Sequence, residues 1–396
     1  MSFDKVLERR GTNCVKWDLI PEGVLPMWVA DMDFEVAPFI REAVIERAKH
    51  GIYGYTTVPA AYYEALCKWY GERHGWRPDP SWIICTTGVV PALSACVKAF
   101  TQPGDKVLIM SPVYNCFFSS IRNYGCEVLD VPLLTEQTPD GPRYIIDFET
   151  LEAAAAEARV MLICSPHNPA GRVWTREELR RVGEICLRHG VIPVCDEIHC
   201  EFVAPGVEFI PFASVSPEFE DACVTLYAAS KAFNVAGLQL ANFIVKDPKL
   251  RALIDKAVNV NEICVVNPFG IVAAQAAYTQ EGWEWLQGLN AYIQSNYGKL
   301  RAALEAFPQL HLYVLEGTYL AWLDIKAICY DGSGKLRIGS AEVADSLMQQ
   351  EKVKFSPGSM YGQEGFLRIN LACPAELMDE GLRRLCKGLK RLLEIA

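Results

Sequence analysis

The stretch ACVTLYAASKAFNVAGLQLANFIV, residues 222–245, contains one lysine, Lys231, and no Asp, Glu or Arg. Its two ends, residues 222–231 and 238–246, are apolar runs that predict two buried strands. A lysine held between such strands loses contact with water, which favours its neutral amine over the ammonium. The ordinary alternative is a long side chain that reaches the surface. Whether Lys231 is structural or chemical therefore depends on what the fold brings beside it.

Outward from this stretch, short apolar runs alternate with amphipathic runs. Strands are predicted at residues 81–88, 105–112, 159–169 and 191–197. Helices are predicted at residues 90–100 and 175–190, the second with Thr175 as its N-cap and Glu178 three residues later. Strands that alternate with helices predict an α/β fold, with a large domain built on a mostly parallel sheet sandwiched by helices.

The last third of the chain has a different pattern. Residues 311–325 predict antiparallel strands, residues 340–352 a helix, residues 365–374 a strand and residues 375–395 a closing amphipathic helix. This predicts a smaller α+β domain. We expect an N-terminal segment, residues 1–45, that packs with the small domain, a large domain over residues 46–284 and the small C-terminal domain over residues 285–396.

Composition narrows the class of protein. The chain has 396 residues, of which 51% are hydrophobic and 22% charged, and a formal net charge of -10. These values indicate a globular fold and argue against a nucleic-acid or anionic-membrane surface. The start, MSFDKVLERRGTN, has no signal-peptide pattern, and 15 cysteines without a C-x-x-C pair predict reduced thiols in the cytoplasm. The spacing of Cys195, His199 and Cys200 matches no common zinc pattern, so no metal is expected.

Residues with chemical or turn-forming roles lie at the carboxyl ends of the predicted strands or directly after them. Because ligands of open α/β sheets bind beyond the carboxyl ends of the strands, we expect these side chains to meet at one edge. They are Gly88, Val89 and Val90 at a helix start, Tyr114, Asn168, Asp196, Ser230 and Lys231. Each alone has an ordinary structural explanation, such as a turn, a cap or a packing contact. Together they match the needs of one cofactor, pyridoxal phosphate.

The aldehyde of pyridoxal phosphate needs a lysine amine, which Lys231 supplies. Its pyridine nitrogen needs a carboxylate to stay protonated, and Asp196 fits. Asn168 and His199 are donors for the ring oxygen, and Tyr114 is an aromatic partner for the ring face.

The phosphate needs backbone N–H groups at a helix start and a hydroxyl. Gly88, Val89 and Val90 open the helix, and Ser230 carries the hydroxyl.

Six motifs resemble a known family, three of them its superfamily and three one branch of it. SPHNPAGRVWTREEL (165–179), CDEIH (195–199) and SKAFNVAGLQ (230–239) resemble the fold-type I pyridoxal-phosphate enzymes of the class I/II aminotransferase superfamily. RRGTNCVKWD (9–18), PMWVADMDF (26–34) and GIYGYT (51–56) resemble its MalY/PatB-type cystathionine β-lyase branch. The similarity runs from about residue 9 to the end of the chain.

The resemblance implies roles for further residues. Arg368 in GFLRIN would bind the substrate carboxylate through its two-pronged guanidinium, and Trp28 and Ala30 would border the substrate. Tyr55 would reach the phosphate of a neighbouring subunit, which implies a homodimer. Many aminotransferases of the superfamily have an arginine eight residues after the lysine; here the position is Gln239. The phosphate would then depend more on backbone and hydroxyl donors.

The resemblance implies a carbon–sulfur β-lyase. Lys231 would remove the α-proton of cystathionine or a cysteine conjugate, a thiolate would leave, and the products would be a thiol, pyruvate and ammonia. A class I/II aminotransferase remains the alternative, because it shares every step through proton removal. A non-enzymatic regulatory or binding protein is a third hypothesis, against which the complete set of chemical residues argues. No G-x-G-x-x-G follows the first strand, which argues against a nicotinamide enzyme.

Overall fold

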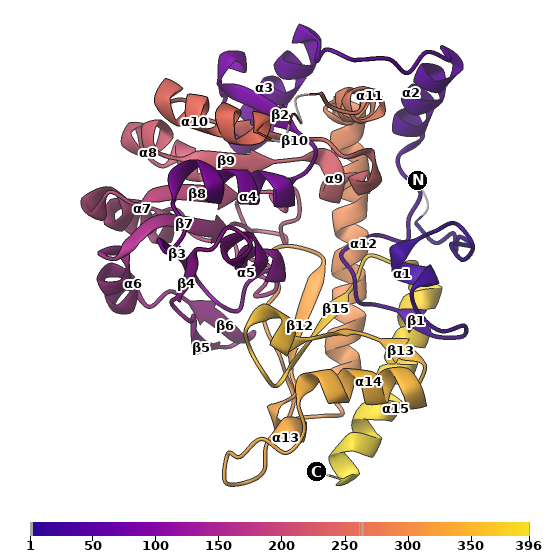
Figure 1. Ribbon diagram of the computed structural model, residues 1–396. Coiled ribbons are helices and arrows are strands. Elements are labelled where there is room, and N and C mark those ends of the chain that lie inside the picture. The colour runs from indigo at the N-terminus through magenta and orange to yellow at the C-terminus, as the bar shows by residue number, and fades with distance from the viewer. Residues whose placement is uncertain (1–2, 261, 263–264, 396) are drawn as a thin grey trace.

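A computed structural model describes residues 3–260, 262 and 265–395 (Figure 1). Its main sheet contains, in spatial order, β2 (Ile83–Thr86), β10 (Ala241–Ile244), β9 (Val224–Tyr227), β8 (Ile192–Asp196), β7 (Ala158–Cys164), β3 (Lys106–Ile109) and β4 (Glu127–Asp130). β10 is antiparallel to both of its neighbours, and the other neighbouring strands pair in parallel. The predicted α/β class with a mostly parallel sheet is confirmed.

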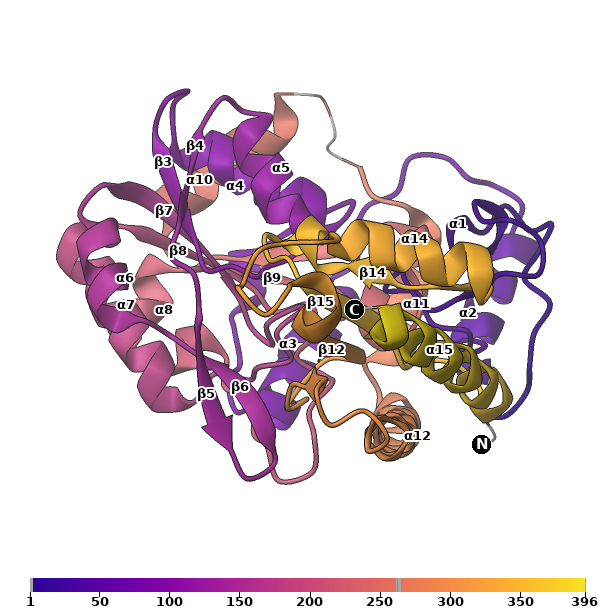
Figure 2. The same cartoon turned by 90° about the horizontal axis from the view of Figure 1, so that it is seen from below.

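Helices cover both faces of this sheet (Figure 2). One face carries α4 (Val89–Phe100), α5 (Asn115–Arg122) and α10 (Pro248–Asn259), and the other carries α3 (Ala60–His74), α6 (Phe148–Ala155), α7 (Arg176–His189) and α8 (Pro217–Ala222). Along β7, Val160 and Leu162 belong to the hydrophobic core on the side of α4, whereas Met161 and Ile163 belong to the core on the side of α7. The alternation is that of a strand buried on both faces, which is why these strands read as continuous apolar runs.

Local signals explain where several elements begin and end. α7 begins with the predicted capping box, in which Thr175 and Glu178 each bond the other's backbone, and it ends at Gly190 in the left-handed conformation. The two strands beside Lys231 are shorter than predicted. β9 ends at Tyr227, and the chain then forms a four-residue helix, α9 (Ala229–Ala232), and the short turn η3 (Ala236–Leu238) before β10 begins. These turns reverse the chain and make β10 antiparallel to β9.

The last part of the chain forms a second sheet of four antiparallel strands. In spatial order these are β11 (His311–Leu312), β12 (Leu320–Asp324), β15 (Phe366–Asn370) and β14 (Ser356–Pro357). The helices α13 (Lys326–Cys329), α14 (Ser340–Gln350) and α15 (Ala375–Ile395) accompany it, together with the turn η4 (Gly358–Tyr361). Near the N-terminus, α1 (Val15–Asp18) precedes β1 (Leu25–Pro26), which pairs in parallel with β13 (Val353–Lys354). This pairing joins the first residues of the chain to the last hundred.

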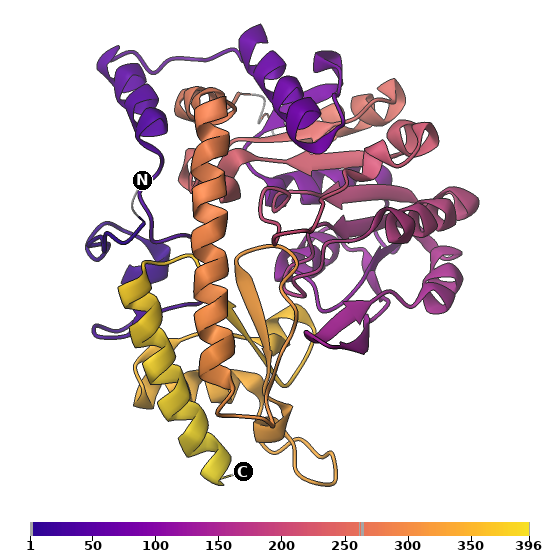
Figure 3. The same ribbon diagram turned by 180° about the vertical axis from the view of Figure 1, so that it is seen from behind.

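A long helix, α12 (Gln280–Leu304), runs along the molecule beside α15, to which it is tied by the Lys299–Asp379 ion pair at 2.7 Å (Figure 3). The predicted domain boundary after residue 284 falls inside α12, and the division into three segments stays a prediction. The remaining elements are α2 (Pro38–Lys49), η1 (Pro80–Trp82), the hairpin β5 (Leu134–Thr138) and β6 (Gly141–Ile145), η2 (Phe212–Ser214) and α11 (Pro268–Ala277). Among the described residues, no helix combines the length and the apolar character that crossing a bilayer requires.

Candidate active site at the carboxyl ends of the strands

A cavity of about 310 Å³ lies at the edge of the main sheet where the parallel strands end. The strand ends and the turns after them contribute Asn168, Asp196, His199, Ser230 and Lys231 to its lining, and the helix starts contribute Gly88, Val89, Val90 and Tyr114. Ala30, from the N-terminal part of the chain, closes one side. The structure thus brings together residues that lie far apart in the sequence, such as Ala30 and Lys231, which are 201 positions apart.

Lys231 lies in α9, directly after β9, and its Nζ donates a hydrogen bond of 2.7 Å to the carbonyl of Ala30. Burial lowers the pKa of the Lys231 amine to about 8. The charges of Asp31 and Asp196 act in the opposite direction, whereas that of Arg368 adds to the lowering. At pH 7 about a tenth of this amine is therefore unprotonated, far more than for an exposed lysine, and a nucleophile or general base uses this neutral form.

Asp196 is the last residue of β8, and its side chain accepts a hydrogen bond of 3.1 Å from the backbone N–H of Ile198. Burial raises the pKa of the Asp196 carboxyl to about 7, and that hydrogen bond and the charge of Lys231 only partly offset the increase. A carboxylate so poorly solvated is stabilised by a cationic partner. The site can therefore hold a protonated nitrogen against Asp196.

Asn168 and His199 line the cavity, and Arg368, which is absent from the lining, contacts Asn168. Arg368, from β15, donates to Asn168 Oδ1 at 3.1 Å and to the Trp28 carbonyl at 2.9 Å. His199 Nδ1 and Arg368 Nε are buried and have no hydrogen-bond partner among the described residues. Burial, together with the charges of Lys231 and Arg368, lowers the pKa of His199 to about 3, so its ring is neutral. Buried donors and acceptors without partners indicate a place where a polar ligand binds.

The start of α4 faces the same cavity. Gly88 is its N-cap, and the N–H groups of Val89 and Val90, in the first turn, lie where a helix has no internal acceptors. With the hydroxyl of Ser230, which also lines the cavity, they form a set of donors for an anion. Tyr114 is the N-cap residue of α5, and burial raises the pKa of its hydroxyl, so the ring stays neutral.

Two predicted residues lie differently from the rest. Tyr55 is fully exposed and borders a separate hollow of about 540 Å³ that is also lined by Tyr63, Asp255 and Val266. Trp28 approaches the site through its carbonyl, whereas its indole donates to the Lys16 carbonyl at 3.1 Å and faces away. The roles predicted for both side chains stay predictions.

The cavity also contains residues that were not predicted to line it. They are Thr87, Pro91, Cys164, Ile198, Ala236 and Gln239. Thr87 and Cys164 stand beside predicted site residues at strand ends, so the same strand-end rule could have found them. Gln239 occupies the position of the missing arginine and adopts a left-handed backbone with φ of 51°.

Metal ligation was weighed for Cys195, His199 and Cys200, but a different trio comes together. Within the described part of the chain, ligand atoms of His74, Cys200 and Glu201 lie within 4.8 Å of one another. Glu201 Oε1 already accepts from Trp69 at 2.6 Å and from Tyr227 at 2.9 Å. These bonds make the group a buried hydrogen-bond cluster, and the expectation of no metal stays a prediction.

Comparisons with known proteins identify the family. The family model for aminotransferase class I and II matches residues 23–385. Cystathionine β-lyase PatB of Bacillus subtilis is 42% identical, covering 97% of this chain and 99% of PatB, and the MalY protein of Escherichia coli is 32% identical, covering 98% of each. A solved PLP-bound C–S lyase from Staphylococcus hominis has a TM-score of 0.90 and 32% identity, covering 98% of this chain and 99% of that one.

The chain therefore belongs to the class I and II aminotransferase family. Its similarity to PatB and MalY over nearly the full length confirms the predicted branch.

Burial of Lys231 predicts how its amine titrates. In the full-length protein without small-molecule ligands, acetylation of Lys231 by acetic anhydride should rise with a midpoint near pH 8, because burial disfavours the ammonium. Peptide mass spectrometry over a pH series measures it, with the exposed Lys249 in the same digest as a reference for reagent decay. A midpoint above pH 10 or so, where exposed lysines titrate, would contradict the burial of this amine.

Proposed function

We propose that this protein is a pyridoxal-phosphate-dependent carbon–sulfur β-lyase that converts cystathionine or a cysteine conjugate into a thiol, pyruvate and ammonia. The observation that carries the proposal is the meeting of Lys231, Asp196 and the start of α4 in one cavity. The names of PatB and of the Staphylococcus hominis enzyme support the lyase, and the latter's bound cofactor supports pyridoxal phosphate.

The residues present fit this cofactor. Lys231 offers an amine of lowered pKa for the aldehyde, and Asp196 offers a poorly solvated carboxylate for the ring nitrogen. His199 Nδ1 is a buried ring nitrogen that still needs a partner, and it lines the cavity. The N–H groups of Val89 and Val90 are hydrogen-bond donors for the phosphate.

Further side chains complete the fit. Asn168 can donate to the ring oxygen, and Tyr114 can stack on the ring face. Ser230 adds a hydroxyl to the phosphate site, and Gly88 lets the chain turn into α4 close to it. Because Gln239 stands where many relatives have an arginine, the phosphate charge would be balanced by the oriented N–H dipoles at the start of α4 and the Ser230 hydroxyl and not by a guanidinium.

When bound, pyridoxal phosphate supplies an aldehyde that captures the substrate amine and a ring that withdraws electrons from the α-carbon. Lys231 Nζ would be released from the aldehyde when the substrate amine takes its place, and as a free amine it would act as the general base that takes the α-proton. Its pKa of about 8 is well matched to this role near neutral pH. Asp196 holds a proton on the ring nitrogen. The Lys231 ammonium formed in the first step is then the nearest acid for the departing thiolate.

Arg368 binds the substrate carboxylate in this proposal. Its Nε has no partner among the described residues, and its Nη1 and Nη2 hold Asn168 and the Trp28 carbonyl, which fixes the plane of the guanidinium. A carboxylate that replaces the weaker of these contacts gains two parallel N–H donors. Ala30 lines the cavity from the N-terminal side, and Trp28 contacts Arg368 through its carbonyl.

An aminotransferase is the second candidate, because the family model bears that description and both reactions begin with removal of the α-proton by Lys231. The two differ in where that proton goes next. The relatives named as lyases favour elimination. A purely regulatory or binding role would leave the matched pair of Lys231 and Asp196 without a use.

Supplying L-cystathionine without a keto acid separates the two enzymes. We expect continuous release of pyruvate and of a free thiol, measured by lactate dehydrogenase coupling and a thiol reagent, because elimination regenerates the site without a second substrate. Lys231→Ala should abolish turnover while its circular dichroism stays native, and the exposed Lys249→Ala should match the wild type. Pyruvate release that waits for an added keto acid would assign the aminotransferase instead.

We also propose that the protein works as a homodimer in which Tyr55 serves the neighbouring subunit's phosphate. Tyr55 is fully exposed, and large exposed side chains lie near it: Ile52 and Tyr53 in the same chain segment and Val265 in the same hollow. An exposed apolar surface of this kind is typical of a subunit interface. The free thiols of the described cysteines support the further proposal of a cytoplasmic location.

A hybrid dimer tests the sharing of Tyr55. Lys231→Ala and Tyr55→Ala subunits, each impaired alone, should recover activity when co-expressed with different tags and purified as the hybrid. One of the two sites then has both residues, so about half of the wild-type activity returns. If Tyr55 serves its own subunit, every site in the hybrid lacks one residue, and no recovery would be seen.

A further inference from the structure

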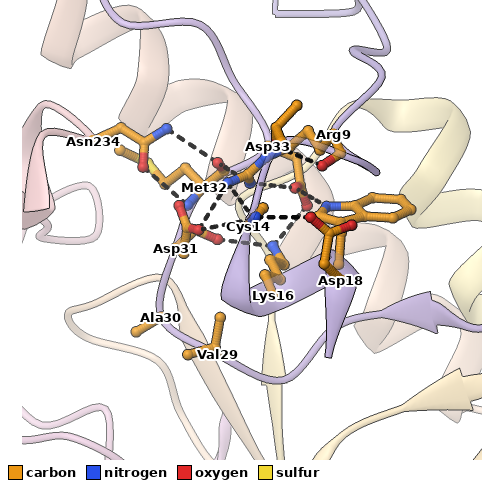
Figure 4. A network of polar contacts seen from close by, with 12 residues as sticks. Arg9, Cys14, Lys16, Asp18, Val29, Ala30, Asp31, Met32, Asp33 and Asn234 are labelled. Carbon is orange, nitrogen blue, oxygen red and sulfur yellow. Dashed lines mark hydrogen bonds and ion pairs between the residues drawn. The ribbon is translucent and has the colours of Figure 1, made fainter. Parts of the chain in front are cut away.

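Residues Trp28–Met32, which we call the strap, have an irregular conformation, and Figure 4 shows Val29, Ala30, Asp31 and Met32 of this segment. The Ala30 carbonyl accepts a hydrogen bond from Lys231. The other four strap carbonyls accept hydrogen bonds from side chains of remote segments. From the C-terminal part of the chain, Asn370 Nδ2 donates to the carbonyls of Val29 at 2.6 Å and Asp31 at 2.9 Å. The strap is therefore held on both sides of the one carbonyl that touches Lys231.

The N-terminal anchor of the strap is a buried ion pair. Lys16 Nζ lies 2.6 Å from Asp33 Oδ2, with side chains that are 1% and 3% exposed, and the same Nζ donates to the Asp31 carbonyl at 2.7 Å. Trp17 adds a hydrogen bond of 2.8 Å to Asp33 Oδ1. Because a buried pair of charges is costly to separate, this anchor fixes the backbone next to Ala30.

A second ion pair lies closer to the cavity and is part-exposed. Arg9 Nη2 contacts Asp31 Oδ2 at 2.8 Å, while Arg9 Nη1 binds the Met32 carbonyl at 2.8 Å. Arg9 Nη1 also contacts Asp33 Oδ1 at 2.7 Å, so Arg9 links the two ion pairs. The side chains of Arg9 and Asp31 are 20% and 33% exposed, so substitution of Asp31 is tolerated better than loss of the buried pair of Lys16 and Asp33. Asn234, three residues after Lys231, also donates to the Met32 carbonyl, at 3.0 Å. The segment around Lys231 and the strap thus share one hydrogen-bond network.

We propose that Arg9 and Asp31 are positioning residues for Lys231. Through the strap they hold the Ala30 carbonyl against the amine, and the balance of their two charges sets how readily that amine gives up its proton. The inference rests on the proposed function, because it names what regulates the basicity of the proposed general base.

Several groups face the Lys231 amine, and their charges decide the direction of each effect. They are Asp31 on the strap, Asp196 at the end of β8, Arg368 on β15, Cys116 on α5 and the neutral His199. Asp31 is an anion that stabilises the ammonium, and after burial it has the largest influence on the pKa of Lys231. Arg9 neutralises Asp31 through their contact. Loss of Asp31 therefore lowers, and loss of Arg9 raises, the proton affinity of Lys231.

Labelling of Lys231 tests this pair without requiring activity. In the full-length, cofactor-free protein we compare the acetylation midpoint of Lys231 in the wild type, Asp31→Asn and Arg9→Gln. A carboxylate in close contact shifts a lysine by about 1–3 units, and exposure of the pair weakens it, so we expect roughly half a unit down for Asp31→Asn and half a unit up for Arg9→Gln. Arg9→Lys, which keeps the charge, should restore the wild-type midpoint.

Glu35→Gln is the matched control, because Glu35 is an exposed carboxylate near the strap that pairs with Lys5 at 2.9 Å. Its midpoint should equal that of the wild type. In the holoenzyme, the acid limb of the kcat–pH profile for cystathionine should move in the same directions, with kcat affected more than KM.

Unshifted midpoints in both variants, or shifts in the same direction, would overturn the proposal. Loosening of the strap alone does not depend on the sign of the charge removed, whereas the proposal requires opposite shifts. The experiment distinguishes failure of the proposed lyase function from failure of the proposed role of Arg9 and Asp31. Opposite shifts in a protein that releases no pyruvate support the pair and contradict the lyase. Pyruvate release together with unshifted midpoints supports the lyase and contradicts the pair.

Discussion

Removal of the Lys231 amine from water is the constraint on which the site depends. Burial brings its pKa down to about 8, and burial at the end of the neighbouring strand brings that of Asp196 up to about 7. An acid and a base are thereby placed in one cavity with proton affinities close to each other and to neutral pH. Within the described part of the chain, neither side chain forms a direct ion pair, so both remain available to a cofactor and a substrate.

The main sheet explains why these groups meet. Parallel strands end at the same edge, so residues that follow β2, β3, β7, β8 and β9 converge there although the chain separates them widely. The remaining walls come from elsewhere. Arg368 is supplied by β15 of the second sheet, and Ala30 by the strap, which is held to that same region by Asn370 and by the pairing of β1 with β13. A site built between two sheets changes shape when one sheet moves relative to the other. Such a movement is one way in which an enzyme excludes water after its substrate binds.

Local patterns predicted much of this arrangement. Buried strands appear as apolar runs, the capping box of α7 is visible as Thr175 and Glu178, and the strand-end rule found most of the residues that line the cavity. The reversal at α9 was not visible, because Ser230 and Lys231 read as the end of a strand until the tertiary contacts of the turn are known. The sequence also did not predict the hydrogen bonds that hold the strap. These bonds join Arg9 and Lys16 to carbonyls of residues 31 and 32, and Asn370 to the same segment from over 300 positions away. No periodicity or motif encodes contacts of that kind.

The covalent link between Lys231 and the cofactor is the central claim, and borohydride reduction tests it directly. The protein is loaded with pyridoxal phosphate, reduced with sodium borohydride and digested, and the pyridoxyl group is located by peptide mass spectrometry. We predict that the label lies on Lys231, within the peptide that joins β9 to β10. A label on another lysine, or none at all, would contradict the assignment of this cavity as the active site.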